Sequence, residues 1–233
     1  MPVALITGGS AGLGRALVQA LAGRGWTVIT DARDGERLAE VARLAAVEPA
    51  AAPIVAITGD VADPDHRVAL IAAVQRLGRL DLLVHNASTL GPVPLRPLRE
   101  LTEADLASTW AVNAGAPAEL TRALLPWLHA AAGVVISLSS DAAVEHYPTW
   151  GVYGATKAAL DHLTLTVGAE EDLLAYAVDP GDMRTAMQQA AFPGEDISDR
   201  QDPAAVVPAF LELLLRRPPS GRYRAVDLVP VRD

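Results

Sequence analysis

The chain has 233 residues, a length that suits one large α/β domain or two small ones. It has no cysteine, which excludes disulfides, thiolate metal ligands and cysteine nucleophiles, and its net charge of −9 argues against a nucleic-acid partner, because binding phosphates needs a basic surface. No apolar run reaches the ~20 residues that span a bilayer, and no leader-like pattern precedes the first apolar run at Val3, so we expect a cytoplasmic protein without membrane contact.

Short apolar runs alternate with longer segments of helical periodicity. In chain order we expect a strand at Val3–Thr7, a helix at Leu13–Arg24, a strand at Thr27–Asp31, a helix at Glu36–Ala46, a loop at Val47–Pro53, a strand at Ile54–Thr58, a helix at Asp65–Leu77, a strand at Leu80–Asn86, a long helix at Glu103–His129 that Pro126 kinks or ends, a strand at Val134–Ser139, a helix at Val152–Ala169, a strand at Leu174–Asp179, a helix at Pro203–Arg216 and a strand at Tyr223–Val229.

Because the strands are apolar on both faces, this alternation predicts one α/β domain over residues 1–233, a doubly wound parallel sheet of about seven strands covered by helices on both faces. Ligands bind such sheets at the carboxyl ends of the strands. Two segments that follow strand ends, Leu90–Arg99 and Met187–Asp202, are rich in proline, glycine or charge. We expect the second of them, around 187–202, to form a loop or lid over a substrate.

A glycine-rich turn, Thr7-Gly8-Gly9-Ser10-Ala11-Gly12-Leu13-Gly14, joins the first strand to the first helix. Glycines permit positive φ and close approach of a pyrophosphate, and the helix N-terminus supplies N–H groups. Alone the pattern is weak, because a tight strand–helix turn produces it too. No Gly-Lys-Ser/Thr follows, so this is not the phosphate loop of the nucleoside triphosphatases.

Three further motifs stand at fixed distances from this turn. Tyr153-Gly154-Ala155-Thr156-Lys157 places a phenol and an amine on one helical face, Ser140 stands thirteen residues before the tyrosine, and Pro180-Gly181-Asp182-Met183-Arg184-Thr185 follows the sixth strand. In their order and spacing these motifs resemble the short-chain dehydrogenase/reductase (SDR) family, in its short single-domain branch. The resemblance implies a Rossmann-like fold and an enzyme that interconverts a ketone and a secondary alcohol by hydride transfer.

The resemblance implies that Tyr153 is the general acid/base and that Lys157 binds the ribose of the nicotinamide. Lysine and the oxidised nicotinamide ring should stabilise the phenolate and lower the tyrosine pKa from about 10. Ser140 matches the serine that hydrogen-bonds the substrate oxygen. Ser137 and Ser139 are nearby alternatives, the first inside the strand and the second facing away from Ser140.

Asn113 matches the family asparagine that holds a water linking the lysine to solvent. The full set expected to contact the dinucleotide is Gly8, Ser10, Ala11, Gly12, Leu13, Gly14, Arg33, Asp60, Val61, Asn86, Ala87, Tyr153, Lys157, Pro180, Gly181 and Thr185, and no metal site is expected. Asp60 either bonds the adenine, as in the family, or caps the next helix, or does both. In His85-Asn86-Ala87-Ser88 only Asn86 and Ala87 match the family's Asn-Asn-Ala-Gly, and we expect His85 beside the cofactor.

The end of the second strand indicates which dinucleotide binds. Ala32 stands where NAD-using members carry an aspartate, and Arg33 where NADP-using members carry an arginine, which favours NADP(H). Asp31 stands one residue early, and strand alternation should turn it to the other face of the sheet. NAD(H) remains the alternative, because the glycine turn has no basic residue.

The expected substrate is a small or medium, partly apolar carbonyl compound. Its walls are predicted to come from Leu90–Pro94, from Asp141–Val152 with Glu145, His146, Tyr147 and Trp150, and from Met183, Met187 and Phe192. Family resemblance suggests a homodimer or homotetramer through the fourth and fifth helices. Two other readings are a dinucleotide-sensing regulatory protein, which loss of Ser140, Tyr153 or Lys157 would favour, and a longer-branch sugar-nucleotide epimerase, which the chain length disfavours.

Overall fold

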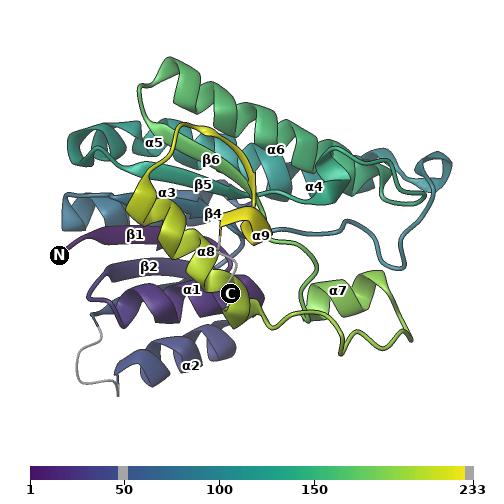
Figure 1. The fold of residues 1–233 in the computed structure, drawn as a ribbon, viewed down its shortest axis with the longest axis horizontal. Helices are drawn as coiled ribbons and strands as arrows, with labels where there is room; N and C mark the ends of the chain where they lie inside the picture. Colours follow the sequence, from purple (N-terminus) through teal and green to yellow (C-terminus); the bar gives the residue numbers. More distant parts are fainter. Residues whose placement is uncertain (47–51, 229–233) are drawn as a thin grey trace.

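Seven parallel strands form the centre of the molecule, between two layers of helices (Figure 1). The computed structural model describes residues 1–46 and 52–228. Its strands are β1 (Val3–Ile6), β2 (Thr27–Ala32), β3 (Ile54–Thr58), β4 (Leu82–His85), β5 (Val134–Leu138), β6 (Leu174–Asp179) and β7 (Gly221–Arg224). Their spatial order is β3-β2-β1-β4-β5-β6-β7, and every neighbouring pair is parallel. The predicted doubly wound sheet is confirmed.

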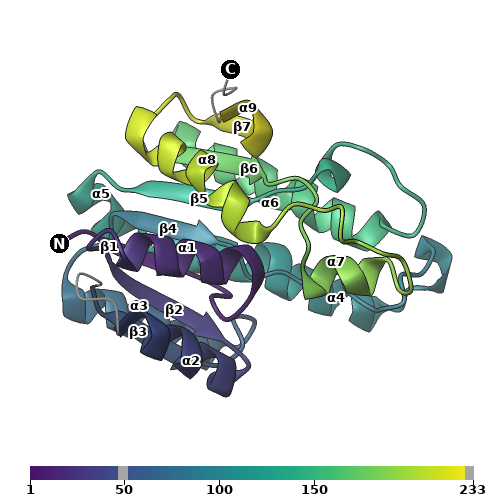
Figure 2. The same cartoon turned by 60° about the horizontal axis from the view of Figure 1, so that its bottom comes forward.

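Each face of the sheet has its own apolar core. Helices α1 (Gly12–Ala22), α2 (Gly35–Ala46) and α8 (Pro203–Arg216) cover one face, and α3 (Pro64–Leu77), α5 (Ala116–Ala131) and α6 (Gly151–Glu170) cover the other (Figure 2). Adjacent residues of β1 show why the strands are apolar on both sides: Leu5 belongs to the core cluster that includes Leu120 of α5, and Ile6 belongs to the one that includes Phe210 of α8. None of the helices in the described ranges has the length and hydrophobicity needed to cross a bilayer.

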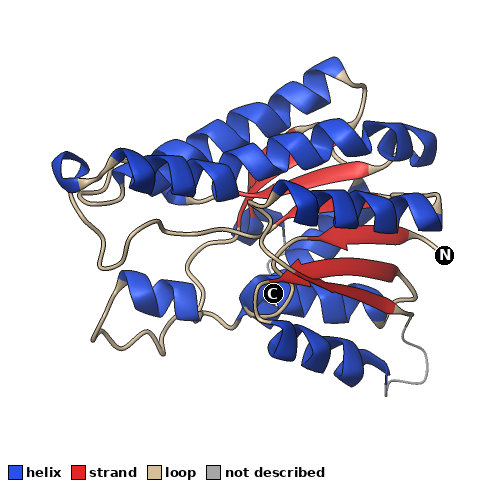
Figure 3. Ribbon diagram, turned by 180° about the vertical axis from the view of Figure 1, so that it is seen from behind, coloured by secondary structure: helices blue, strands red, loops and turns tan. Residues whose placement is uncertain are grey.

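The winding of the sheet reverses between β1 and β4. From β1 the chain builds outward to β3, and from β4 it builds the other way to β7. The carboxyl ends of β1 and β4 therefore flank the crevice in which doubly wound sheets bind ligands. Helix α7 (Ala186–Ala191) stands apart from the two helical layers, beyond these strand ends (Figure 3).

The long predicted helix is two helices in the structure. Helix α4 (Glu103–Trp110) is followed by a π-helical turn, η2 (Ala111–Gly115), and then by α5. Pro126 does not end the helix, as one of the two predicted outcomes had it, because α5 continues for another turn beyond the proline. Leu124 and Leu128, buried on either side of the proline, anchor this part of α5 and offset the hydrogen bond that a proline removes.

Two further predictions need correction. The segment 187–202, expected to be a loop, includes most of α7, whose start is capped by the Thr185 hydroxyl accepting from the Gln188 N–H. The strand predicted at Tyr223–Val229 ends at Arg224, because its partner β6 ends at the paired Asp179, and residues 225–228 form the short helix α9 (Ala225–Leu228). Val229 and most of the loop predicted at Val47–Pro53 lie outside the described residues.

Candidate active site

The glycine turn between β1 and α1 is held by two side chains, which come from the strands on either side of β1 or from just after them. Asp31 of β2 accepts a hydrogen bond from the Gly8 N–H through Oδ1 (2.8 Å). Asn86, after β4, donates from Nδ2 to the main-chain carbonyls of Thr7 (2.8 Å) and Gly8 (3.1 Å). A Cβ on Gly14 would stand 2.3 Å from the Gly8 carbonyl oxygen, so only glycine permits this close packing of turn and helix. The N-terminus of α1 consequently opens onto the cleft described next.

A cleft of about 790 Å³ runs along the carboxyl ends of the strands. The residues of the predicted dinucleotide set that line it are Gly8, Ser10, Ala11, Gly12, Leu13, Arg33, Asp60, Val61, Asn86, Ala87, Tyr153, Lys157, Pro180 and Thr185. Two members of the set support the cleft without lining it. Gly14 lies beneath the glycine turn, and Gly181 adopts φ +72° in the turn after β6, where its N–H bonds Asp179.

The end of β2 contributes Arg33 to the lining of the cleft, together with two carboxylates, Asp31 and Asp34, that already have partners in the protein. Asp31 is buried, and its second oxygen lies 2.9 Å from Nε2 of His66 on α3, so both of its oxygens are engaged. Arg33 is exposed at the rim of the cleft. The neighbouring Asp34 pairs with Arg37 (3.2 Å). A negatively charged ligand at this rim would therefore meet guanidinium groups.

Asp60 lines the cleft directly after β3. Its Oδ1 accepts a hydrogen bond from the Ala62 N–H (2.9 Å), whereas the side chain that caps α3 belongs to Asp63, which accepts from the Asp65 N–H. Of the two interpretations of Asp60, the helix cap is therefore wrong. The position of Asp60 in the cleft is compatible with the other interpretation, in which its carboxylate bonds the adenine.

Tyr153 and Lys157 lie one turn apart on the first half of α6, and both are buried at the base of the cleft. The Lys157 Nζ donates a hydrogen bond to the Leu138 carbonyl at the end of β5 (2.7 Å) and lies 5.6 Å from the centre of the Tyr153 ring. Gly154 allows this approach, because a Cβ there would stand 2.5 Å from the carbonyl oxygen of Ala142. The segment that follows β5 thus packs closely against the start of α6, beside these two groups.

Burial shifts the pKa values of both groups toward their neutral forms. It lowers the pKa of Lys157 to about 8, against the attraction of the Asp161 carboxylate. It raises the pKa of Tyr153 above its usual value, an effect that the Ser140 hydroxyl opposes. The sequence predicted a lowered tyrosine pKa. The sign differs because, in the protein alone, desolvation of the phenol and the nearby carboxylates of Asp141, Asp179 and Asp161 raise the pKa, and the Ser140 hydroxyl alone does not offset them.

The three serines at the end of β5 have different surroundings. Ser137 Oγ accepts from Thr164 Oγ1 of α6 (2.6 Å), and Ser139 Oγ donates to Asp161 (2.7 Å), so both turn into the protein. Ser140 begins the short 3₁₀ helix η3 (Asp141–Ala143), and its hydroxyl accepts from the Ala142 N–H and donates to Asp141. Of these three serines, Ser140 is the one whose hydroxyl lowers the pKa of Tyr153.

Asn113 is fully buried in the π turn η2 and uses every polar atom of its side chain. Its Oδ1 accepts from the Ser88 hydroxyl (3.1 Å) and the Thr89 N–H (2.8 Å). Its Nδ2 donates to the Thr89 carbonyl (2.8 Å) and to Thr156 Oγ1 (3.0 Å) on α6. The side chain therefore ties the loop after β4 to the helix that carries Tyr153. A water at this position would have to bind the main chain.

His85 does not lie beside the cleft as expected. Its Nε2 is 2.7 Å from Thr121 Oγ1 of α5, on the opposite side of β4 from the glycine turn, and burial lowers its pKa to about 3. The side chain is thus a neutral core histidine. Its immediate successor Asn86 carries the contacts to the turn, as strand alternation requires.

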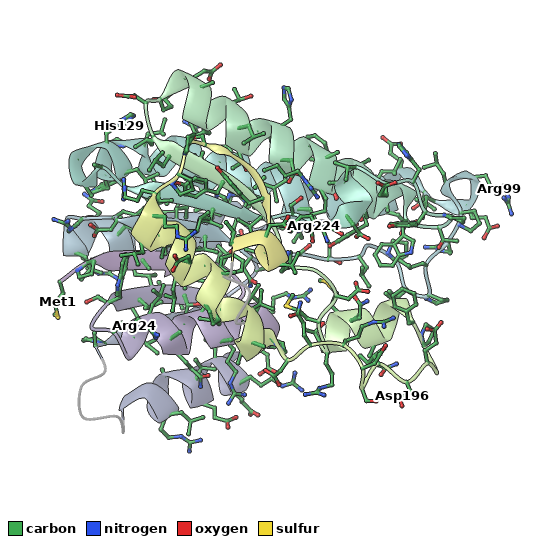
Figure 4. The ribbon with its side chains drawn as sticks, viewed as in Figure 1. Met1, Arg24, Arg99, His129, Asp196 and Arg224 are labelled. Carbon is green, nitrogen blue, oxygen red and sulfur yellow. The ribbon has the colours of Figure 1, made fainter. Side chains whose placement is uncertain are left out.

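Aromatic and methionine side chains cover the Tyr153 end of the cleft. Trp150 meets the Tyr153 ring edge-on (5.5 Å between centres) and lies 6.0 Å from Phe192, just after α7. Leu90 and Met187 join the same apolar cluster, whereas the predicted wall residues Glu145 and Tyr147 are exposed. Figure 4 shows Arg99 and Asp196 on the two segments that extend beyond the strand ends here. His146 is exposed.

Several polar residues around the site had not been singled out from the sequence. Asp161 is one turn beyond Lys157, which is a local signal, and Arg222 contacts it from β7, for which no local signal exists. His66 was missed because only the fold brings it to Asp31. Within the described ranges, no three histidine, aspartate or glutamate side chains group as a metal ion would require.

Comparison with known proteins gives one consistent answer. The family model described as short chain dehydrogenase matches residues 2–196. The oxidoreductase YciK of Escherichia coli K12 is 33% identical over 218 residues, which is 91% of this chain and 85% of that protein. Rat sepiapterin reductase is 32% identical over 81% of this chain and 77% of that protein. A short chain dehydrogenase from Shigella flexneri 2a strain 301, solved with NADP, superposes with a TM-score of 0.89 at 29% identity, covering 97% of each chain. This chain therefore belongs to the short-chain dehydrogenase/reductase family of oxidoreductases.

Proposed function

We propose that this protein is an NADP(H)-dependent oxidoreductase that interconverts a ketone and a secondary alcohol. The observation that carries the proposal is the position of Tyr153 and Lys157 at one end of a cleft whose other end is formed by the glycine turn and Arg33. A proton donor and an anion-binding turn at opposite ends of one cleft suit a dinucleotide whose reactive ring reaches the donor.

The cleft fits a dinucleotide at several points. The turn before α1 can accept a pyrophosphate, because Gly8 (φ +74°) and Gly12 (φ +53°) leave no side chain over the helix N-terminus. Asp60 would face the adenine, and the turn at Pro180–Thr185 would hold the carboxamide. When bound, the nicotinamide supplies or accepts the hydride.

The protein's own groups handle the proton. In reduction, the Tyr153 hydroxyl donates its proton to the carbonyl oxygen as the carbon gains the hydride, and the Ser140 hydroxyl hydrogen-bonds the same oxygen. The proton and the hydride together convert C=O into CH–OH. The resulting phenolate is stabilised by the Lys157 ammonium. In the reverse direction the phenolate takes the proton from the alcohol.

The choice of NADP(H) rests on Arg33. A 2′-phosphate at the rim would pair with this guanidinium. The two carboxylates near the strand tip that could select a 2′-hydroxyl are already engaged, Asp31 with Gly8 and His66 and Asp34 with Arg37. Relatives solved with NADP and with NADPH support the same choice. We expect Arg33→Gln to weaken NADPH binding about tenfold, the loss of one charged hydrogen-bond pair, and to leave NADH binding unchanged in calorimetry. Tighter binding of NADH by the natural protein would refute the assignment and favour the same chemistry with NAD(H).

The test of the activity is the loss of reduced-nicotinamide absorbance with a panel of ketones. Tyr153→Phe keeps the ring that packs on Trp150 but has no proton to give, so we expect turnover to fall by about 10²–10⁴-fold with NADPH affinity unchanged. Tyr223→Phe is the matched control. It removes, from a tyrosine on β7, a hydroxyl that donates to the Pro219 carbonyl, and it should stay active. Equal turnover by Tyr153→Phe and the natural protein would contradict the proposal. NADPH binding without turnover of any ketone would favour a dinucleotide sensor.

We also propose that residues 187–202 act as a substrate lid, because Met187 and Phe192 pack over the Tyr153 end of the cleft. The protein is further proposed to be a cytoplasmic homodimer or homotetramer. Ala155 and Ala158, small and exposed on α6, would let a second copy approach closely, and sedimentation velocity would measure the assembly.

A further inference from the structure

A group of charged side chains lies directly behind the candidate active site. Asp161 follows Lys157 by one turn on the same face of α6 and is only 7% exposed. Its Oδ2 accepts hydrogen bonds from Ser139 Oγ (2.7 Å) and from Arg222 Nε (3.1 Å). One carboxylate oxygen thus links α6 to the end of β5 and to β7.

Arg222 connects this carboxylate to the strand ends. Its Nη2 donates to the main-chain carbonyl of Ser140 (2.9 Å) and lies 3.5 Å from Asp179 Oδ2 at the end of β6. Because the donors of a guanidinium point in fixed directions within one plane, a single arginine holds three chain segments in register. One of those segments carries the hydroxyl of Ser140.

Lys157 has a different relation to the group. Its amine bonds the Leu138 carbonyl, and the Asp161 charge raises its pKa while burial lowers it to about 8. The other ionisable or charged side chains around the site are Tyr153 on α6, Asp141 after β5, Asp179 at the end of β6 and Arg222 on β7. Among the buried side chains of this group, two carboxylates, Asp161 and Asp179, lie with two cations, Lys157 and the partly buried Arg222, while Asp141 is exposed.

We propose, on the basis of the proposed function, that Asp161 and Arg222 are positioning residues: Asp161 keeps the Lys157 amine protonated, and Arg222 holds the main chain that presents the Ser140 hydroxyl. Neither residue touches the reacting atoms. Asp161 acts through the lysine, and Arg222 acts through the serine. Together they join the two halves of the proton-transfer machinery, which come from α6 and from β5.

The negative charge of Asp161 distinguishes a residue that keeps Lys157 protonated from one that only links α6 to β5 by hydrogen bonds. Burial raises the pKa of Asp161, so keeping its carboxylate ionised lowers the stability of the folded protein. Its Oδ1 is buried without a hydrogen-bond partner in the part of the chain that the structure describes. A neutral asparagine could accept the same bonds from Ser139 and Arg222, so a mere link between α6 and β5 would not need the charge.

The sequence makes a direct test possible, because Lys157 is its only lysine. Protein labelled with ¹³C at lysine Cε gives one side-chain NMR signal, whose shift reports the protonation of this amine. In Asp161→Asn we expect the pKa of Lys157 to fall from about 8 to about 7. The control Glu170→Gln removes an exposed charge from the far end of the same helix and should leave the titration unchanged. Asp161→Glu, which keeps the charge, should restore most of the shift.

The pH profile gives the second readout. If turnover needs the protonated amine, the fall of kcat/KM at high pH should move down by the same amount in Asp161→Asn. At pH 8 the protonated fraction would drop from about one half to about one tenth, a roughly fivefold loss. Arg222→Lys keeps every charge but cannot bond Asp161 and Ser140 together. We expect it to lower kcat about tenfold with NADPH affinity unchanged, and this variant tests the proposal even if Asp161→Asn does not fold.

The outcomes separate the two proposals. A Lys157 pKa that is the same in Asp161→Asn and the natural protein overturns the role of Asp161, and an unchanged kcat in Arg222→Lys overturns that of Arg222. The NMR titration needs neither substrate nor turnover. If the pKa falls as expected but no ketone is reduced, the proposed function fails while the coupling of Asp161 to Lys157 stands.

Discussion

Replacing Lys157 by methionine should alter the stability of the protein in a way that depends on pH. The amine is buried, and its pKa of about 8 lies below the usual value of 10.5. At 1.36 kcal/mol for each pKa unit, the charged amine costs the folded protein about 3 kcal/mol relative to the neutral amine. Methionine has a similar length and no charge, so it removes this cost.

The direction follows from which state holds the proton. Below pH 8 the amine is protonated in both the folded and the unfolded chain, and the full cost is present. Between pH 8 and pH 10.5 the unfolded chain binds the proton that the folded chain has released, so the natural protein gains stability as the pH rises. The stability of Lys157→Met, measured against the natural protein, should therefore decline by about 3 kcal/mol between pH 7 and pH 10.5.

Urea unfolding followed by circular dichroism at four or five pH values measures this difference. Methionine also loses the hydrogen bond to Leu138, which adds an offset, but that offset is the same at every pH. Lys157→Arg is the comparison variant: arginine does not titrate in this range either, so its stability against the natural protein should decline by the same amount, but from a lower starting value because its charge stays buried at every pH. A difference between Lys157→Met and the natural protein that is constant across pH would refute the reasoning.

Two other substitutions test the parts of the fold that hold the cleft. Gly14→Ala places a Cβ 2.3 Å from the Gly8 carbonyl and 2.4 Å from Asn86 Nδ2, so it should cost about 1–3 kcal/mol in urea unfolding and weaken NADPH binding at least tenfold in calorimetry; unaltered affinity would contradict the described packing. Phe210→Ala empties a site on α8 that is 1% exposed, and it should lower the free energy of unfolding by about 3–5 kcal/mol while leaving NADPH affinity as it was. A loss below 1 kcal/mol would show that this core face tolerates the cavity.

The elements that the sequence predicted well are those whose signal is local. Helix α6 begins and ends within one residue of the prediction, and β3 and β6 match it at both ends. The end of β7 at Arg224, by contrast, depends on a distant partner. β7 ends because β6 ends, and no pattern within residues 221–229 contains that information.

The site divides in the same way. Spacing predicted that Tyr153 and Lys157 share one face of a helix, as they do, and the family resemblance added Ser140 at the end of the preceding strand. Spacing could not show that Arg222, 82 residues beyond Ser140, bonds its carbonyl, since this contact exists only once β7 has paired with β6. Nor could it weigh burial against charge at Tyr153, where the pKa moved in the direction opposite to the one expected.

The use of lysine at a single position explains how stability and function are linked here. An arginine stays charged wherever it is buried, whereas a buried lysine acquires a pKa that its neighbours can set. This chain uses arginine for every other basic side chain apart from its histidines and keeps lysine for position 157, where α6, Leu138 and Asp161 determine the protonation of the amine. The burial that lowers stability by about 3 kcal/mol near neutral pH is therefore the same burial that makes the amine responsive to Asp161, and a variant that relieves the cost should lose that response with it.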